Sequence, residues 1–345
     1  MLDKQDLKDV IFYEELHLKH INLLLDLKSN KNNSWFYKMA IINTLDDLKR
    51  LLISLDKIKT KCIIAIKEKK IIGFLYTYPL NENKTCIKIN TPNLIDNNYS
   101  KTKRTLILEL IRNSIINTDL KTSSWLINSE INNQDLISCA RELGFQPLQE
   151  VILLSKTKKI KKNFNALPKS PEIENFISIN KENIQKVLNF VRSNETISIR
   201  NILDFNQNDI YKRNDKFCGS IYNDNEILFT ILKDTNYSDE DVYSFTRGPL
   251  WDVRIKTTLK IVLEKLYLHN PKIILKTYSK DKELLAFLLD SGFYEFRSEL
   301  ILVRNNLIKR ELKASNKINK SFESILDKIN PQGNQLPSPF PISKT

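Results

Sequence analysis

The chain has 345 residues, which is enough for two domains of roughly 150 residues each. Glycine supplies only 6 of these residues, far below its usual share of about 7%, and no two glycines stand close together. A Walker loop and a dinucleotide fingerprint both need closely spaced glycines, which let a phosphate approach the backbone. The sequence therefore excludes these two classes of nucleotide-binding site.

The chain is basic, with 54 Lys and Arg against 41 Asp and Glu and a formal net charge of +13. The charge is spread over both halves, which argues against a dedicated nucleic-acid-binding arm. The 4 cysteines have no CxxC spacing, so neither a zinc site nor a disulfide framework is predicted. No stretch of the sequence is apolar for the length that a membrane span needs. We expect a cytoplasmic protein that makes no contact with a membrane.

The first half begins with a strand and an amphipathic helix that contains Ile21, Leu24 and Leu25. Apolar runs then predict three strands, over residues 62–66, 71–78 and 85–89, and a period of 3.6 residues predicts a helix over 106–116. A further strand and a helix of about ten residues lead to Gly144-Phe145 and to a last strand. The glycine is expected to end the helix with a positive φ angle.

The second half repeats this order. When Gly292-Phe293 is laid on Gly144-Phe145, the apolar runs on both sides of the last helix also coincide. Upstream, strands are predicted over residues 217–222, 226–232 and 241–245, and a helix over 255–268. Each half is therefore predicted to run strand, helix, three strands, helix, strand, helix, strand.

Composition shifts divide the chain into four parts. Residues 1–158 and 172–308 are the two predicted domains, and a lysine- and proline-containing stretch at 159–171 is a predicted linker. The lysines of this linker either form a solvated connector or dock phosphates. Residues 309–345 hold one short apolar helical stripe and a proline-rich tail, which is either an unstructured end or a docking arm.

The doubled element order, with a Gly-Phe after each last helix, resembles the GNAT (Gcn5-related N-acetyltransferase) superfamily in two tandem copies, over about residues 8–156 and 172–305. The resemblance implies a mixed α/β fold of two acyl-CoA N-acyltransferase-like domains, each a twisted mixed sheet flanked by helices. It also implies transfer of an acyl group from acetyl-CoA to an amine. In this superfamily the fourth strand splays away from the fifth, and the pantetheine arm of the cofactor lies in the opening.

The resemblance places the cofactor's pyrophosphate on a loop before the second predicted helix of each half, where unpaired backbone amides and the helix dipole bind anions. Both loops depart from the glycine-containing pattern of the superfamily, and Pro249 removes one donor amide from the second loop. Basic side chains could replace the lost amide contacts, or they could lie in solvent at the start of the helix. A Trp could stack on the adenine, or it could pack in the protein interior. The candidate cofactor-binding residues are Lys101, Thr102, Lys103, Arg104, Thr105, Arg247, Gly248, Trp251 and Arg254.

The tyrosine that usually protonates the leaving thiolate is replaced by Ala140 and Leu288. Candidate acids and bases remain in the second half, at Tyr243, Tyr278 and Asp241. Asn133 keeps the position of a substrate-contacting Asn, but Asn133 and Asp281 also stand where helices begin, and capping explains both.

No metal site is predicted. Glu14, His17 and His20 have a suitable helical spacing, but they are expected to straddle the end of the first strand. Two functions remain open. The first is an acyltransferase with a CoA thioester and an amine acceptor as partners. The second is a catalytically degenerate binding or scaffold protein, with a basic surface for an acidic protein or RNA.

Overall fold

The computed structural model describes residues 10–25, 40–41, 44, 60–95, 103–118, 122–156 and 175–305, except for 216, 224, 236, 238–239, 250 and 252. The predicted linker at 159–171 and the tail at 309–345 lie outside these residues. No described helix has both the length and the apolar character needed to cross a membrane.

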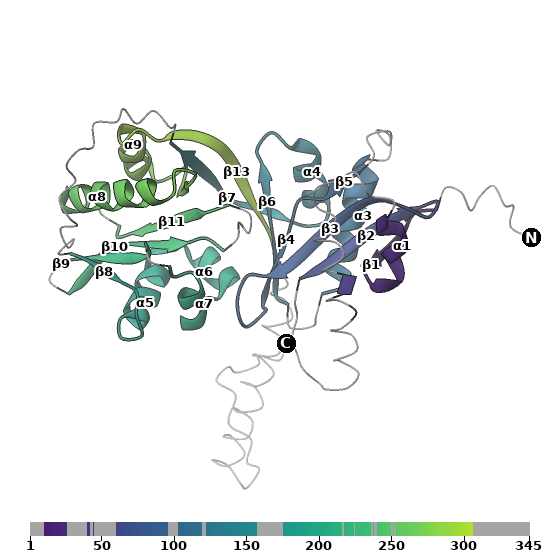
Figure 1. Ribbon diagram of the computed structural model, residues 1–345, viewed down its shortest axis with the longest axis horizontal. Helices are drawn as coiled ribbons and strands as arrows, with labels where there is room; N and C mark the ends of the chain where they lie inside the picture. The colour runs from purple at the N-terminus through teal and green to yellow at the C-terminus, as the bar shows by residue number, and fades with distance from the viewer. Residues whose placement is uncertain are drawn as a thin grey trace, which may run out of the picture. The chain divides into compact units, whose positions relative to one another are not determined.

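The first half follows the predicted order and adds two short elements that the sequence pattern did not predict, the 3-10 helix η2 and the strand β5 (Figure 1). Its strands and helices are, in chain order, β1 (Phe12–Glu15), η2 (Leu18–His20), α1 (Ile21–Leu25), β2 (Lys61–Lys67), β3 (Lys70–Pro79), β4 (Cys86–Ile89), β5 (Asn93–Leu94), α3 (Lys103–Ile116), β6 (Ser124–Glu130), α4 (Gln134–Glu142) and β7 (Gln146–Ser155). The apolar periodicity that predicted these elements matches their burial, since β4 is buried along its whole length and α3 buries Leu106, Leu110 and Ile111.

The second half repeats the order and adds two short helices that the sequence pattern did not predict, α6 and α7. Its elements are β8 (Phe176–Ser178), α5 (Ile184–Asn194), α6 (Ile197–Leu203), α7 (Gln207–Lys212), β9 (Gly219–Asn223), β10 (Glu226–Lys233), β11 (Val242–Arg247), α8 (Val253–His269), β12 (Ile274–Tyr278), α9 (Lys282–Asp290) and β13 (Tyr294–Asn305). Thr196 and Asn206 cap the two added helices, which are too short to show a clear apolar period.

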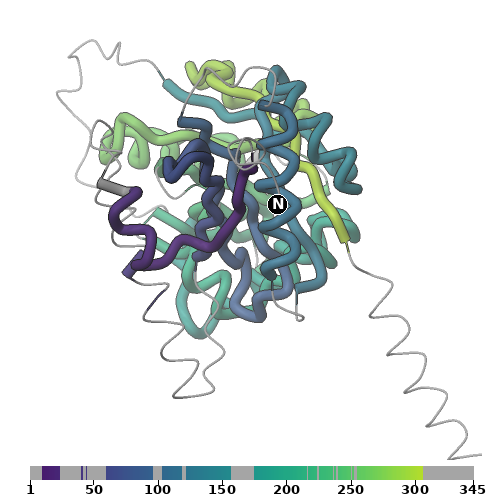
Figure 2. Tube along the Cα trace, turned by 90° about the vertical axis from the view of Figure 1, so that its right-hand side faces the viewer, coloured from purple at the N-terminus to yellow at the C-terminus, as the bar shows by residue number. Residues whose placement is uncertain are grey.

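The described strands form one continuous sheet, in which the two halves exchange their last strands. β13 lies between β6 and β7, and β7 lies between β13 and β12. Each half's final strand therefore pairs with strands of the other half and with none of its own. Figure 2 shows the yellow end of the described chain running beside the teal strands of the first half.

Helices cover both faces of the second half's strands, with α8 and α9 on one face and α5, α6 and α7 on the other (Figure 1). One buried cluster joins α5, α7, α8 and α9 to the strands around Phe229, Leu259 and Leu288. A second cluster, around Leu110, Ile127 and Phe145, packs α3 and α4 on the first half's strands.

Both helix-ending glycines have the predicted backbone conformation. Gly144 has a φ of 85° and Gly292 a φ of 86°. Each glycine directly precedes a buried phenylalanine, Phe145 or Phe293. The repeated Gly-Phe thus turns the chain out of a helix and anchors the start of the following strand in the core.

Candidate functional site

Two equivalent pairs of parallel strands diverge, one in each half. β4 pairs with β6 from Cys86–Ser124 to Ile89–Ile127. β11 pairs with β12 from Val242–Ile274 to Ser244–Lys276 and then continues without it to Arg247. Both openings are lined by side chains that follow the last paired residues, so the repeat places two candidate sites at corresponding positions.

The first opening contains a polar cavity of about 350 Å³. The first half lines it with Lys88 and Asn90 at the end of β4 and with Asn128 and Glu130 at the end of β6. The second half completes the wall with Tyr237, Glu240, Arg297 and Glu299. The cavity therefore depends on the strand exchange, because Arg297 and Glu299 lie on β13.

Glu299 organises the polar groups of this cavity. Its carboxylate accepts hydrogen bonds from the Tyr237 hydroxyl at 2.7 Å and from Asn128 Nδ2 at 3.1 Å, and Arg297 Nε forms an ion pair with it at 2.8 Å. Arg297 Nη2 also donates to Glu240 at 2.9 Å. Asn128 Oδ1 is buried and has no hydrogen-bond partner among the described residues. This oxygen can accept an N–H from a ligand.

Lys88 is a buried amine at the point where β4 and β6 diverge. Burial lowers its pKa to about 8, against opposing effects of Asp234 and Glu299. Its Nζ lies 4.9 Å from the centre of the Tyr237 ring, and Lys276 Nζ lies 5.8 Å from the same ring. Lys276 also forms a buried ion pair with Asp234 at 2.7 Å. Tyr237 therefore contacts the cations of both openings.

The second opening contains a smaller cavity of about 50 Å³, bounded by α5, α6, β11 and β12. Tyr278 lines it and donates a hydrogen bond to Glu195 Oε1 at 3.0 Å. Burial raises the pKa of Glu195 and holds the pKa of Tyr278 well above its usual value. Burial therefore disfavours the charged form of both groups.

The other two predicted acid–base residues do not line either cavity. The Tyr243 hydroxyl donates to Asp215 Oδ2 at 2.7 Å, and burial raises the Tyr243 pKa. Asp241 accepts from Lys233 Nζ at 2.6 Å and from Asn270 Nδ2 at 2.7 Å. The structure thus brings only Tyr278, of the three, to an opening.

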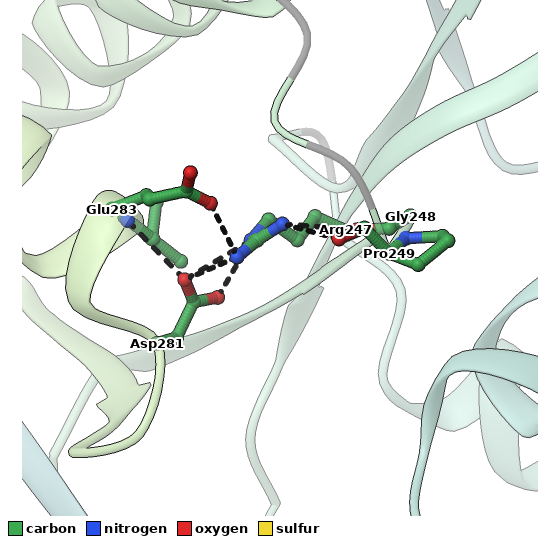
Figure 3. A network of polar contacts seen from close by, with 6 residues as sticks. Arg247, Gly248, Pro249, Asp281 and Glu283 are labelled. Atoms are coloured by element: carbon green, nitrogen blue, oxygen red, sulfur yellow. Dashed lines mark hydrogen bonds and ion pairs between the residues drawn. The ribbon is translucent and has the colours of Figure 1, made fainter.

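A network around Arg247 joins the end of β11 to the start of α9 (Figure 3). Arg247 Nε donates to both oxygens of Asp281, at 3.0 and 2.9 Å, and Nη2 contacts Asp281 at 2.8 Å and Glu283 at 2.9 Å. Its Nη1 donates to the carbonyl oxygens of Gly248 and Pro249. The network thus links the end of β11 to the start of α9, which lie on opposite sides of the second opening.

The remaining predicted cofactor residues of the second half have packing or backbone partners. The Trp251 ring packs against Phe287, with ring centres 5.7 Å apart, and Arg247 lies over the Trp251 ring. The Gly248 N–H donates to the Leu228 carbonyl at 3.1 Å, so this amide already has an acceptor. Arg254 lies on α8, and its side chain is outside the described part of the structure.

Acidic side chains of α4 engage the basic start of α3 in the first half. Lys103 Nζ lies 2.9 Å from Asp135, and Arg104 Nη2 lies 2.7 Å from Glu142. Thr105 is exposed, and Lys101 and Thr102 lie outside the described residues. Both exposed ion pairs are weak enough for a phosphate to compete with them.

Asn133 caps α4, because its side chain accepts from the Leu136 N–H at 3.2 Å, and Asp281 caps α9 in the same way at 3.3 Å. Among the described residues, no group of His, Cys, Asp and Glu is arranged to hold a metal ion. His20 instead contacts Glu14 at 3.2 Å, and burial lowers the His20 pKa.

Lys88, Glu195 and Glu299 line the two cavities but were not predicted as site residues. The available signal for Lys88 and Glu299 was a charged residue within an apolar run, CIKI or ELILV. A buried charge in such a run needs partners, and both of these residues lie in the first cavity.

No protein-family model and no curated protein sequence matches the chain. Several solved structures, however, are similar to the chain. The GCN5-related glucosamine N-acetyltransferase region of a fungal multi-domain β-N-acetylglucosaminidase aligns with a TM-score of 0.51 and 12% identity, over 86% of this chain and 38% of that one. A GCN5-related N-acetyltransferase from Sphaerobacter thermophilus aligns at 0.48 and 10% identity, over 87% of this chain and 96% of that one.

A tandem GNAT protein from the clavulanic acid biosynthesis pathway also aligns at 0.48 and 10% identity, over 86% of this chain and 98% of that one. The strand and helix order and the diverging strand pairs agree with the likeness to the fungal N-acetyltransferase region. The chain therefore has the fold of that GCN5-related N-acetyltransferase region, with an order of strands and helices that occurs twice and with the last strands exchanged.

Proposed function

We propose that the chain is an acyltransferase that moves an acetyl or related acyl group from a CoA thioester to an amine, and that transfer occurs in the first opening. The observation that carries this proposal is the polar cavity of about 350 Å³ at the divergence of β4 and β6. Its buried Asn128 Oδ1, which lacks a described partner, suits an amide N–H of the pantetheine arm or the N–H of an acceptor amine.

The second opening is a poorer acyl-CoA site. Its cavity is about 50 Å³, and the Arg247–Asp281 ion pair joins the segments between which a pantetheine arm would lie. Both ion-pair partners are mostly buried, with side chains 15% and 16% exposed. Breaking such a pair to admit a cofactor is costly, because each charge would be left in a largely buried place. We therefore expect one acyl-CoA molecule per chain.

In the first opening, the acceptor nitrogen attacks the thioester carbon, a C–N bond forms and the C–S bond breaks. Glu130, at the cavity wall, is the proposed base that takes the proton from the amine. Lys88 is the proposed acid that protonates the leaving thiolate, in place of the absent tyrosine. Its pKa of about 8 is close to that of an ordinary thiol, about 8.5, so the proton transfer is nearly balanced.

The ion pairs at the helix starts favour a second candidate function, a degenerate binding or scaffold protein. Lys103, Arg104 and Arg247, three of the predicted phosphate ligands, are all engaged by carboxylates. In that case the chain would bind an acidic protein or RNA through other basic groups, and acyl-CoA would not bind.

Calorimetric titration with acetyl-CoA separates the two functions. The acyltransferase proposal predicts one site per chain, weakened at least tenfold by Asn128→Leu and unchanged by Tyr278→Phe, the matched variant in the second opening. Circular dichroism checks that both variants fold. The absence of heat at millimolar acetyl-CoA, together with salt-dependent retention of RNA, would support the scaffold instead. Two sites per chain would refute closure of the second opening.

A further inference from the structure

We propose that the cavity of the second opening binds a carboxylate of two or three carbons, such as acetate or propionate. This proposal does not require acyl transfer in the first opening. It rests on the size, charge and lining of a cavity bounded by α5, α6, β11 and β12.

The size of the cavity limits the ligand. A water-sized group needs roughly 10–15 Å³ of such volume, so about 50 Å³ holds roughly three to five of these groups. Acetate has four non-hydrogen atoms and propionate has five. A nucleotide, a sugar or a dicarboxylate of several carbons is too large for this cavity.

The charge of the lining favours an anion. Four basic side chains line the cavity, and only two carboxylates do so; the six residues are Arg192, Arg200, Arg213, Lys276, Glu195 and Asp234. Asp234 already forms an ion pair with Lys276 at 2.7 Å, and Glu195 already accepts a hydrogen bond from Tyr278 at 3.0 Å. A further carboxylate outside the lining, Asp204, reaches Arg192 only at 3.8 Å.

Arg213 is the central cation. It is 8% exposed, and its recorded hydrogen bonds go to neutral groups, from Nε to the Lys233 carbonyl at 3.1 Å and from Nη2 to Ser244 Oγ at 2.8 Å. Phe205 lies against its guanidinium, 4.9 Å from the ring centre. Among the described residues, no carboxylate lies within ion-pair distance of it, and Glu195 interacts with it only through its charge at longer range. Because a buried guanidinium is stabilised by a bidentate carboxylate, a small carboxylate in this cavity supplies the missing partner.

Apolar atoms line the rest of the cavity, from Val191, Ile199, Leu203 and Phe245. They suit a methyl or ethyl group and leave an inorganic anion such as chloride or phosphate without polar partners on that side. The cavity thus combines a guanidinium for the carboxylate with an apolar wall for a short alkyl chain.

The test is a calorimetric titration of the full chain with sodium acetate and sodium propionate at constant ionic strength, against chloride, phosphate and ethylammonium. Because acetate has only four non-hydrogen atoms, its Kd can be sub-millimolar at best. Saturable binding of acetate or propionate below about 10 mM is expected. No saturation in that range would overturn the proposal, as would equal affinity for chloride.

Variants locate the site. Arg213→Gln is expected to weaken acetate binding at least tenfold, and Lys186→Gln, an exposed change on the same α5 that lines the cavity, is expected to leave it unchanged. Leu203→Phe keeps every charge and fills part of the cavity, so it should also abolish acetate binding. This variant tests the site independently if Arg213→Gln does not fold. Unchanged acetate binding in Leu203→Phe would place the ligand elsewhere and refute the assignment.

Discussion

Two residues with a positive φ angle end the repeated helices, and each is a glycine. At Gly144, an added Cβ would meet nothing closer than Arg304 Nε at 4.0 Å. The cost of Gly144→Ala is therefore conformational and not steric, and we expect it to destabilise the fold by about 1 kcal/mol. Gly248→Ala is the matched control, since Gly248 has no positive φ and its nearest contact is at 3.9 Å. Urea denaturation of both variants measures the difference, and equal losses would contradict this explanation.

The charge of Lys88 is disfavoured by its buried surroundings. Because its pKa in the fold, about 8, lies below 10.5, the unfolded chain binds the proton more tightly, and the charged amine costs stability near pH 7. Lys88→Met should therefore raise the free energy of unfolding at pH 7, by at most on the order of 3 kcal/mol. The gain should shrink as the pH rises from 8 towards 10.5, where the native Lys88 loses its proton first.

Chemical denaturation of the Lys88→Met protein at pH 7 and pH 9.5 tests whether the free energy of unfolding rises and whether the rise is smaller at the higher pH. Lys70→Met, an exposed change on β3 of the same sheet, is the control and should have little effect at either pH. If the Lys88→Met protein is less stable than the unchanged chain at pH 7, the attraction of Asp234 and Glu299 for the Lys88 charge is larger than the cost of burying that charge.

At the scale of elements, the starts of α4 and α9 show how the two copies have diverged. Asn133 only caps its helix, whereas Asp281 caps its helix and also holds Arg247. We expect Asn133→Ala to cost about 1 kcal/mol, the usual value of a cap. Asp281→Ala should cost about 3 kcal/mol, because it also leaves a largely buried guanidinium without its main partner. Thermal or chemical unfolding compares the two, and equal costs would show that the ion pair adds no stability.

The order of elements within each half could be predicted because apolar periodicity and the Gly-Phe pairs are local signals. The pairing of β7 and β13 could not, since an apolar run shows that a strand is buried without showing which strands lie beside it. Because of the same strand exchange, part of the candidate site could not be predicted from the sequence. Glu299 belongs to the second half but lies in the first half's cavity, and Lys88 is one lysine in a lysine-rich chain. Tyr278 is one of three candidate acids and bases in the second half, and of the three it alone lines one of the two cavities.

At the scale of the whole molecule, the exchange of β7 and β13 makes the two halves depend on each other. β7 pairs only with β12 and β13, and β13 pairs only with β6 and β7, among the described strands. We therefore expect residues 1–158 and 172–345, expressed separately, to be insoluble or unfolded, because each would carry a long apolar strand without a partner. Expressed together, they should form a stable complex, since all the strand pairings can then be made.

Size-exclusion chromatography and circular dichroism of the separate and co-expressed halves give the readout. A full chain cut by a protease at a site inserted into residues 159–171 is the control, and its two pieces should stay together after cleavage. The intact chain should also unfold in one cooperative transition, because neither half can lose its last strand without disrupting the other. Two well-folded separate halves, or two transitions with unequal midpoints, would show that the exchange is not needed for stability and that each copy can complete its own sheet.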